Sequence, residues 1–244
     1  MRADIYLYEN SYCKSRNRAK QLIESGSVSA NGRTILKPSE QIPDNADIII
    51  DQNKCPEAKY VGRGALKLKH ALSHFGIDVG GRICCDIGAS TGGFTQVLLE
   101  QGAEKVYAVD SGENQLDETL RTNARVISME NTNARYLTKE RFPENINLVV
   151  MDVSFISQTL IYPAIIQTVS HPCDIITLVK PQFETMSKSN LGKNGVVKDE
   201  KTRRDALENV IKAAKSYGFE FCGSTESPIT GSSGNIEYLI HLKA

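Results

Sequence analysis

Two lysines and two carboxylates stand where a fold of alternating strands and helices would place a reactive site. Three of them end or open an apolar run, and one precedes the first such run: Asp152, Lys180, Glu237 and Lys67. A lysine can take the proton of a poor nucleophile such as a hydroxyl if its pKa is brought down from about 10.4. A second ammonium or a dry pocket lowers that pKa, and carboxylates oppose the shift. Taken singly, each residue also fits a solvated lysine or a capping aspartate, and Lys69 is an alternative to Lys67.

A glycine-rich turn, Asp86-Ile87-Gly88-Ala89-Ser90-Thr91-Gly92-Gly93-Phe94, follows the first of these runs. Small residues let the backbone turn tightly beside a ligand, and the next helix offers free N–H groups. The spacing differs from the dinucleotide fingerprint G-x-G-x-x-G, which argues against a dehydrogenase. Asp110 ends the second run about twenty residues after Gly88, where a carboxylate binds ribose hydroxyls. The pattern indicates a nucleoside cofactor.

These residues need a scaffold, and the pattern from residue 64 onward alternates between strands and helices. We predict strands at 82–86, 105–109, 125–128, 148–152, 173–179, 220–225 and 238–242, and helices near 64–75, 92–101, 114–121, 157–168 and 201–217. Such alternation predicts an α/β fold with a doubly wound, mostly parallel sheet. No clear helix separates the last two strands, so one of them should be antiparallel. Open sheets of this kind bind ligands at the strands' carboxyl ends.

The first fifty residues have a different character. Between Lys14 and Lys37 there are six basic residues and one acidic residue, Glu24. Ser15 is a good N-cap for a basic helix that ends at Gly26. The pair Asn31-Gly32 between two short alternating runs predicts a β-hairpin. A short helix at 5–9 and a strand at 47–50 complete this segment, whose basic helix also fits an ordinary solvated face.

A polar, proline-interrupted stretch at 51–60 predicts a connection between these parts. We place a small N-terminal α+β domain at 1–58, a linker at 59–63 and the α/β domain at 64–244.

Composition sets broad limits. The 244 residues carry 29 basic and 29 acidic side chains, which excludes a uniformly basic nucleic-acid-coating protein but not a local basic face. The chain has no apolar run long enough to span a membrane and no signal-peptide pattern, so we expect a soluble cytoplasmic protein. The six cysteines form no C-x-x-C pair and, with four histidines, no zinc site, so we expect no metal.

The turn and the four reactive residues together resemble the FtsJ-like S-adenosylmethionine-dependent ribose 2′-O-methyltransferases. The resemblance implies a Rossmann-like fold and a catalytic tetrad of Lys67, Asp152, Lys180 and Glu237. It also implies S-adenosylmethionine as cofactor, bound by Asp86, Gly88, Ser90, Thr91, Gly92, Phe94, Asp110, Asn133 and Asp152. The family often has Asp where this chain has Asn133, which can still bond an adenine edge but also fits an ordinary turn.

The order Ser-Arg-x-x-Ala-x-x-Leu-Ile-x-x-Gly-x-Val with Asn-Gly resembles an S-four-like RNA-binding module over about residues 2–50. It implies RNA contacts from Arg2, Lys14, Arg16, Arg18, Lys20, Arg33 and Lys37, and we add Arg63 at the start of the second domain. The whole chain, with Lys-Pro-Gln-Phe-Glu and Gly-Asn-x-Glu-Tyr, resembles the TlyA, or hemolysin A, family. That resemblance implies 2′-O-methylation of cytidine in ribosomal RNA, of the small subunit and in some members also the large one. Two loops, 192–199 and 227–234, are candidates to approach the RNA or the target nucleotide, although both fit ordinary surface loops.

Other functions fit less well. A non-catalytic ribosome assembly factor would keep the second domain as a scaffold, and the intact tetrad argues against it. Amino-directed base methyltransferases usually carry Pro-Pro-aromatic after the fourth strand, where this chain has Val153-Ser154-Phe155. Nothing in the pattern supports the pore-forming role that the word hemolysin suggests. We expect ribosomal subunits as partners, no membrane, and favour a monomer.

Overall fold

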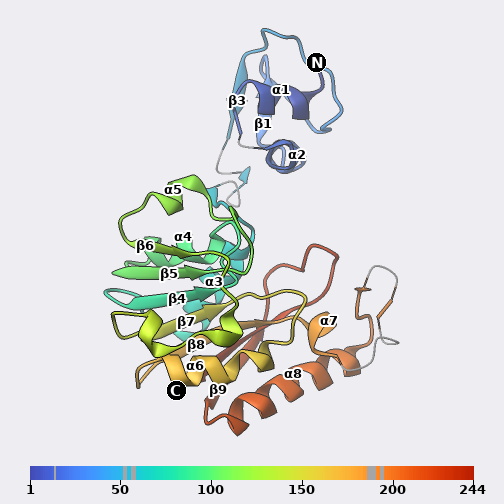
Figure 1. Ribbon diagram of the computed structural model, residues 1–244. Helices are drawn as coiled ribbons and strands as arrows, with labels where there is room; N and C mark the ends of the chain where they lie inside the picture. Colours follow the sequence, from blue (N-terminus) through green and yellow to red (C-terminus); the bar gives the residue numbers. More distant parts are fainter. Residues whose placement is uncertain (14, 52–53, 56–58, 186–190, 193–194) are drawn as a thin grey trace. The chain divides into compact units, whose positions relative to one another are not determined.

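A computed structural model describes residues 1–13, 15–51, 54–55, 59–185, 191–192 and 195–244. The chain forms two compact units, Met1–Val61 and Gly62–Ala244, and the division falls inside the predicted linker. Each unit is described by itself (Figure 1). No helix among the described residues is long and apolar enough to cross a membrane.

The N-terminal unit is a small α+β domain. Its elements are α1 (Ala3–Glu9), α2 (Arg16–Glu24), β1 (Val28–Ala30), β2 (Arg33–Thr34) and β3 (Ile48–Ile50). The strands form an antiparallel sheet in the order β2-β1-β3. Apolar side chains of both helices and of the sheet form its core.

Local signals in this unit act as predicted. The Ser15 hydroxyl accepts a hydrogen bond from the Arg18 N–H at 3.2 Å and caps α2. Gly26 follows that helix with a φ of 69°, a backbone conformation that residues with a side chain rarely adopt. Asn31 and Gly32 both have positive φ, which matches the twist of a two-residue hairpin between β1 and β2.

The second unit is built on one seven-stranded sheet. Its strands are β4 (Ile83–Ile87), β5 (Lys105–Val109), β6 (Val126–Met129), β7 (Leu148–Met151), β8 (Asp174–Val179), β9 (Glu220–Glu226) and β10 (Tyr238–Lys243). The order is β6-β5-β4-β7-β8-β10-β9. All neighbouring pairs from β6 to β8 are parallel, and β10 runs antiparallel to both β8 and β9. The predicted mostly parallel sheet with one reversed strand is confirmed.

Helices cover both faces of this sheet (Figure 1). The α-helices are α3 (Gly64–Phe75), α4 (Gly93–Glu100), α5 (Glu118–Arg121), α6 (Tyr162–Thr168), α7 (Pro181–Glu184) and α8 (Glu200–Ser216), with short 3₁₀ turns η3 (Ala134–Tyr136), η4 (Lys139–Arg141) and η5 (Gln158–Leu160). Helices α6 and α8 pack with alternate strand residues in one large core. Helices α3 and α4 contribute nothing to that core and contact each other and the sheet from the other side.

Three helices depart from the sequence prediction. The helix predicted at 114–121 is reduced to α5, because Asn114 has a φ of 53° and Asp117 caps a new start. The helix predicted at 157–168 divides into η5 and α6, and Pro163 stands in the first turn of α6. The single turn α7, directly after Lys180, was not predicted, and it begins with Pro181.

Candidate active site

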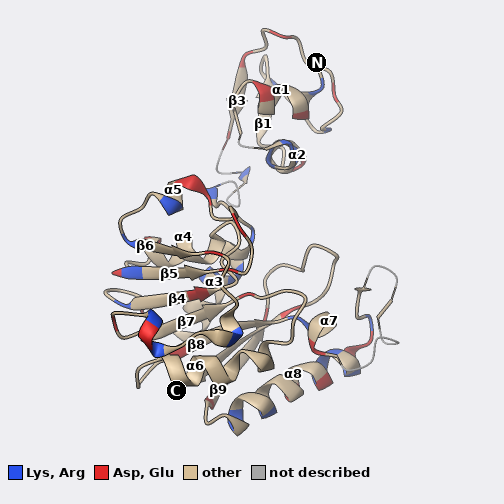
Figure 2. Cartoon of the chain, viewed as in Figure 1, with Lys and Arg blue, Asp and Glu red and all other residues tan. Residues whose placement is uncertain are grey.

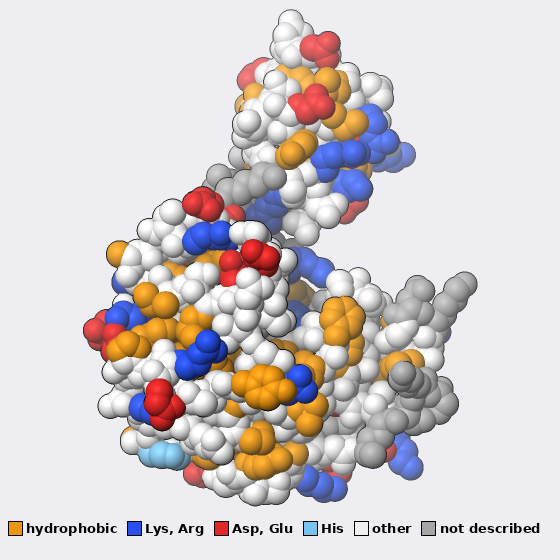
Figure 3. All heavy atoms as spheres, viewed as in Figure 1, with side chains coloured by type: hydrophobic (Ala, Val, Ile, Leu, Met, Phe, Trp, Pro, Cys, Tyr) orange, Lys and Arg blue, Asp and Glu red, His pale blue; other side chains and the backbone are white. Residues whose placement is uncertain are grey.

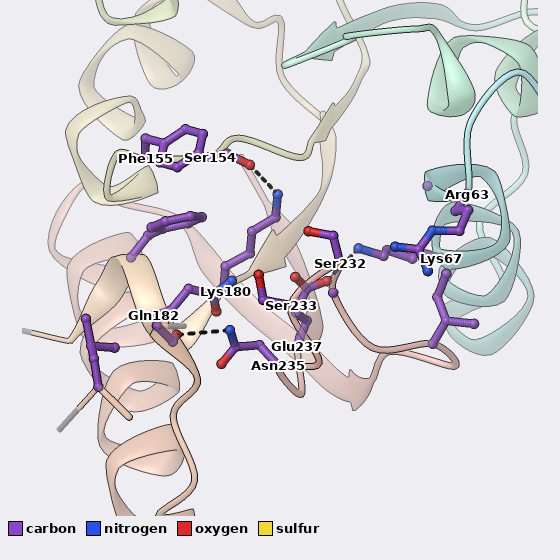
Figure 4. A pocket seen from close by; sticks show the side chains of 16 residues that line it. Arg63, Lys67, Ser154, Phe155, Lys180, Gln182, Ser232, Ser233, Asn235 and Glu237 are labelled. Carbon is purple, nitrogen blue, oxygen red and sulfur yellow. Dashed lines mark hydrogen bonds and ion pairs between the residues drawn. The ribbon is translucent and has the colours of Figure 1, made fainter. Parts of the chain in front are cut away.

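Lys180 and Asp152 meet at the carboxyl edge of the sheet. Each follows directly after its strand, β8 and β7, and these two strands are parallel neighbours. The Lys180 Nζ lies 2.6 Å from Asp152 Oδ1, and both side chains are mostly buried. The same Nζ donates a hydrogen bond to the Ser154 Oγ at 2.8 Å (Figure 4). The lysine is therefore held on two sides by residues of the segment that follows β7.

Lys67 and Glu237 form the second pair. Lys67 Nζ donates to Glu237 Oε2 at 2.5 Å, and the two side chains are only 9% and 3% exposed. Lys67 comes from α3 and Glu237 immediately precedes β10. The strand β10 runs antiparallel to β8, with Tyr238 opposite Val179. The start of β10 therefore lies at the same edge as the ends of the parallel strands, which brings Glu237 beside Lys180.

Three of these four residues line a cavity of about 420 Å³ (Figure 4). Lys67, Lys180 and Glu237 line it, and so does Arg63 at the start of α3. Both candidate loops reach it, through Gly195 in one and through Gly231, Ser232 and Ser233 in the other; positions 193 and 194 of the first loop lie outside the described residues. A Cβ on Gly231 would lie 2.5 Å from Glu237 Oε1, so this glycine lets the second loop approach the carboxylate.

A second cavity of about 470 Å³ lies over the ends of β4, β5, β6 and β7. Its walls include Gly88, Ser90, Asp110, Asn133 and Asp152, all of which the sequence singled out. It also includes Ser111, Thr132, Val153, Ser154, Phe155 and Ile156, which sequence reasoning did not assign. Their position close after Asp152, in Val153-Ser154-Phe155-Ile156, was the available signal for four of these residues.

The glycine turn explains how this cavity keeps its shape. Gly88 has a φ of 82°, and a Cβ there would lie 2.5 Å from the Asp152 carbonyl oxygen. The Ser90 N–H donates to Asp110 Oδ2 at 2.8 Å, and the Gly112 N–H donates to Oδ1 at 2.7 Å. The Asp110 carboxylate is thus fixed at the cavity wall, where its remaining lone pairs suit a pair of ribose hydroxyls.

Asn133 caps a turn and also lines the second cavity. Its Oδ1 accepts from the Arg135 N–H at 3.1 Å and caps the turn η3. Its exposed side chain also lines the second cavity. Because the oxygen is used in the cap, the amide N–H₂ is the group that suits an adenine acceptor.

Four predicted cofactor residues do not line the second cavity: Asp86, Thr91, Gly92 and Phe94. Phe94 is buried, and a Cβ on Gly64 would lie 3.4 Å from its ring, so it packs beside the start of α3. Gly92 has a φ of 96°, and a Cβ on it would clash with the Leu120 side chain. These residues support the turn, and the structure gives them no direct place on the cavity wall.

Asp86 is completely buried at the end of β4. The Thr95 hydroxyl donates to its Oδ2 at 2.7 Å, while Oδ1 has no hydrogen-bond partner. Burial raises the pKa of this carboxyl to about 7; the Thr95 hydrogen bond opposes the rise, and the negative charge of Asp152 adds to it. Asp86 therefore takes up its proton near neutral pH behind the cavity.

The two cavities share Ser154 and Phe155. Phe155 is 92% exposed and has a φ of 64°, which is costly for a residue with a large side chain. Its ring lies 5.2 Å from that of Phe183. Glu184 anchors the segment, because its carboxylate accepts from the Ser157 hydroxyl at 2.5 Å and from the Gln158 N–H at 2.9 Å. The junction of the cavities is thus a strained but anchored turn.

The predicted RNA-binding side chains of the N-terminal unit fall into two groups. Arg2 and Arg16 both bind the buried carboxylate of Asp4, each at 3.0 Å. Their guanidinium groups lower the pKa of Asp4 to about 2 against the effect of burial. These two arginines therefore stabilise the domain, a role that the spacing of basic residues did not indicate.

The other predicted side chains that the structure describes do not contact Asp4, and some of them have partners of their own. Arg33 pairs with Glu40, and Arg18 donates to the Tyr60 carbonyl at 3.1 Å. Lys37 is exposed and Lys20 is partly exposed, whereas Lys14 lies outside the described residues. Basic residues lie on α2 (Figure 2), and basic side chains gather on the same part of the N-terminal unit in the space-filling view (Figure 3).

Relatives of known identity share both units. Residues 60–244 match the FtsJ-like methyltransferase family, and residues 1–48 match the S4 domain. A Brachyspira hyodysenteriae protein named Hemolysin A is 43% identical over 242 residues, which cover 99% of each chain. The Mycobacterium tuberculosis 16S/23S rRNA (cytidine-2′-O)-methyltransferase TlyA is 42% identical over 99% of this chain and 89% of its own. A Campylobacter jejuni protein named 23S rRNA (cytidine-2′-O)-methyltransferase TlyA is 38% identical over 93% of both chains.

Solved structures agree with this assignment. One from Streptococcus thermophilus, whose name calls it a hemolysin, has a TM-score of 0.78 and 42% identity and covers all of this chain and 88% of that one. An S-adenosylmethionine-dependent methyltransferase from Listeria monocytogenes has a TM-score of 0.55 at 15% identity and covers 71% of this chain and 96% of that one. At this identity, the similarity shows a shared fold alone. The predicted Rossmann-like methyltransferase fold is confirmed. The chain therefore belongs to the FtsJ-like methyltransferase family and to its TlyA/hemolysin A branch, which carries an S4 domain at the N-terminus.

Proposed function

We propose that this protein transfers a methyl group from S-adenosylmethionine to the ribose 2′-hydroxyl of cytidine in ribosomal RNA. The observation that carries the proposal is the arrangement of Lys67, Asp152, Lys180 and Glu237 where two cavities adjoin. The relatives named as rRNA cytidine-2′-O-methyltransferases support the reaction and the substrate.

The second cavity suits the cofactor. Asp110 would hold the ribose, Asn133 the adenine edge, and the turn from Gly88 to Ser90 the remainder of the molecule. Bound S-adenosylmethionine supplies a methyl group activated by its sulfonium centre. Asp152 lines this cavity and contacts Lys180 of the other, so the methyl group and the hydroxyl would meet beside these two residues.

The first cavity suits the target nucleotide, which must leave its stack for the enzyme to reach its sugar. Lys180 would take the proton of the 2′-hydroxyl as the oxygen attacks. Glu237 orients the Lys67 ammonium, which would position the hydroxyl. The exposed side chain of Arg63, on the wall of this cavity, would contact an RNA phosphate.

The S4 domain would supply sequence-independent affinity for RNA through its basic side chains. Lys20 and Lys37 suit this role best, because Arg2 and Arg16 are already paired with Asp4. Ribosomal subunits are therefore the proposed substrates.

The decisive experiment measures transfer of a labelled methyl group from S-adenosylmethionine into purified small and large ribosomal subunits, followed by alkaline hydrolysis. A 2′-O-methyl blocks cleavage at its nucleotide, so label in dinucleotides supports the proposal, and the labelled subunit identifies the substrate. Label in mononucleotides would mean base methylation. Binding of the cofactor without any transfer would favour the assembly-factor alternative. A separate red-cell lysis assay with the same protein tests the activity that the name hemolysin suggests.

A further inference from the structure

We propose that Ser154 is a positioning residue that fixes the direction of the Lys180 amine toward the target hydroxyl. This inference rests on the proposed function and adds a fifth residue to the Lys67, Asp152, Lys180 and Glu237 group. The observation behind it is the 2.8 Å hydrogen bond from Lys180 Nζ to Ser154 Oγ (Figure 4), together with the place of Ser154 on the walls of both cavities.

The two partners of Lys180 restrict the position of its amine. A lysine ammonium has three N–H bonds and no lone pair. One N–H donates to Ser154 Oγ, and Asp152 Oδ1 lies 2.6 Å from the same nitrogen as its ion-pair partner. Lys180 also lines the first cavity, so its amine is within reach of a group bound there. A target hydroxyl bound in this cavity would therefore meet an amine that Ser154 and Asp152 already hold.

Asp152 alone would leave the amine free to rotate. A lysine side chain has four rotatable carbons, and a single ion pair fixes the distance of its nitrogen but not the orientation of its N–H bonds. A second acceptor on a different atom removes this freedom. Lys67 also has a carboxylate partner, the buried Glu237 at 2.5 Å, whereas Lys180 has the Ser154 hydroxyl in addition to its carboxylate partner Asp152.

The backbone around Ser154 is built to hold its hydroxyl in place. The next residue, Phe155, has a φ of 64°, a conformation that persists only where the surroundings enforce it. Two hydrogen bonds from Ser157 and Gln158 to Glu184 tie this segment to α7, the turn that follows Lys180. Both ends of the Lys180–Ser154 hydrogen bond therefore belong to one anchored unit.

In the reaction, the 2′ O–H bond breaks and its proton goes to the lone pair of Lys180 Nζ. The same oxygen forms a bond to the methyl carbon, whose bond to sulfur breaks, and a neutral thioether leaves. Ser154 forms no bond to the substrate. Its contribution is to keep the lone pair in line with the hydroxyl proton, and a displacement of about 1 Å in such an alignment can cost about a hundredfold in rate.

The test compares wild-type protein with Ser154→Ala and Ser154→Thr, using ribosomal subunits and labelled S-adenosylmethionine. We expect Ser154→Ala to lower kcat by about 10- to 100-fold while KM for the subunit and Kd for S-adenosylmethionine change less than about twofold. Ser154→Thr should recover most of the rate, because it keeps the hydroxyl and the position is exposed.

Three outcomes would overturn the inference. A kcat of Ser154→Ala within twofold of wild type would show that the hydroxyl orients nothing. A rate loss matched by an equal loss of cofactor affinity would assign Ser154 to the cofactor wall alone. A wild-type protein that transfers no label to the 2′-hydroxyl would overturn the proposed function itself. Because wild type is measured beside the variants, this result is distinguishable from a failure of the Ser154 inference alone.

Discussion

The Lys67 ammonium and the Glu237 carboxylate lie 2.5 Å apart, although 170 positions separate them along the chain. Both are buried, so each neutralises a charge that would otherwise be isolated in a region of low dielectric constant. The pair connects α3 to the start of β10 at the wall of the first cavity. Loss of the pair should therefore affect both the stability of the protein and methyl transfer. Chemical denaturation measures the first effect and an activity assay measures the second.

Glu237→Gln should destabilise the protein, because it leaves the Lys67 ammonium buried without a counter-charge. Loss of one partner of a buried pair typically costs about 3–5 kcal/mol of unfolding free energy, measurable by chemical denaturation. The double variant Lys67→Met/Glu237→Gln should recover part of the stability but no methyl transfer. Lys69→Ala on the exposed side of the same helix is the matched control and should keep both properties; equal losses in Lys69→Ala would contradict the assignment of Lys67.

Lys180→Ala should abolish methyl transfer and leave the affinity for S-adenosylmethionine nearly unchanged. Lys180 does not line the second cavity, whereas its partner Asp152 does. A general base typically contributes about 10²- to 10⁴-fold to a rate. Single-turnover transfer gives the rate and calorimetry gives the affinity. Turnover close to wild type would remove Lys180 from the proton-accepting role.

Gly88→Ala should be more harmful than an alanine at a glycine with similar φ and free space. At Gly88 a new Cβ would lie 2.5 Å from the Asp152 carbonyl oxygen, in addition to the strain of a φ of 82°. Gly81 has a φ of 68° and nothing within 4 Å, so Gly81→Ala measures strain alone, of about 1–2 kcal/mol. We expect Gly88→Ala to lose cofactor binding and further stability. Equal thermal stability and equal cofactor binding in the two variants would show that the close approach to Asp152 has no importance.

Asp86 should make stability depend on pH near neutrality. Its pKa in the folded protein is raised from 3.8 to about 7, so the folded state binds this proton more tightly than the unfolded chain does. The unfolding free energy should therefore fall as pH rises from about 4 to about 7, by a few kcal/mol for this group. Asp86→Asn should flatten this part of the curve measured by urea denaturation. An unchanged slope would mean that Asp86 titrates normally.

Two classes of basic side chain in the N-terminal unit should respond differently to substitution. Lys20→Ala and Lys37→Ala should weaken subunit binding and reduce the salt dependence of log K, by about one unit of slope per lost phosphate contact. Arg16→Ala should chiefly destabilise the domain, because it removes a partner of the buried Asp4. Thermal unfolding and binding at several salt concentrations distinguish the two effects. A stable Arg16→Ala protein with a reduced salt slope would place Arg16 on the RNA.

Much of the fold followed from local pattern. Apolar runs separated by helical periodicity indicated the seven strands of the second unit, and Ser15, Gly26 and Asn31-Gly32 marked the limits of elements in the first. These signals are local, since capping and turn formation depend on a few neighbouring residues. Helix limits were less predictable at 114–121 and 157–168, where a capping Asp117 and a proline at the start of α6 override periodicity.

The types and order of the candidate site residues were also present in the sequence, because strands that end at one sheet edge bring their following residues together. Only the tertiary structure decided which charges pair. It paired Lys67 with Glu237, Lys180 with Asp152, and Arg2 and Arg16 with the buried Asp4. It buried Asp86 and Phe94, which do not line the second cavity. It also brought Ser154 to Lys180 through a strained turn that no periodicity signals. Such pairings depend on distances between residues far apart in the chain, and those distances are fixed only when the sheet, its reversed strand and its helices pack together.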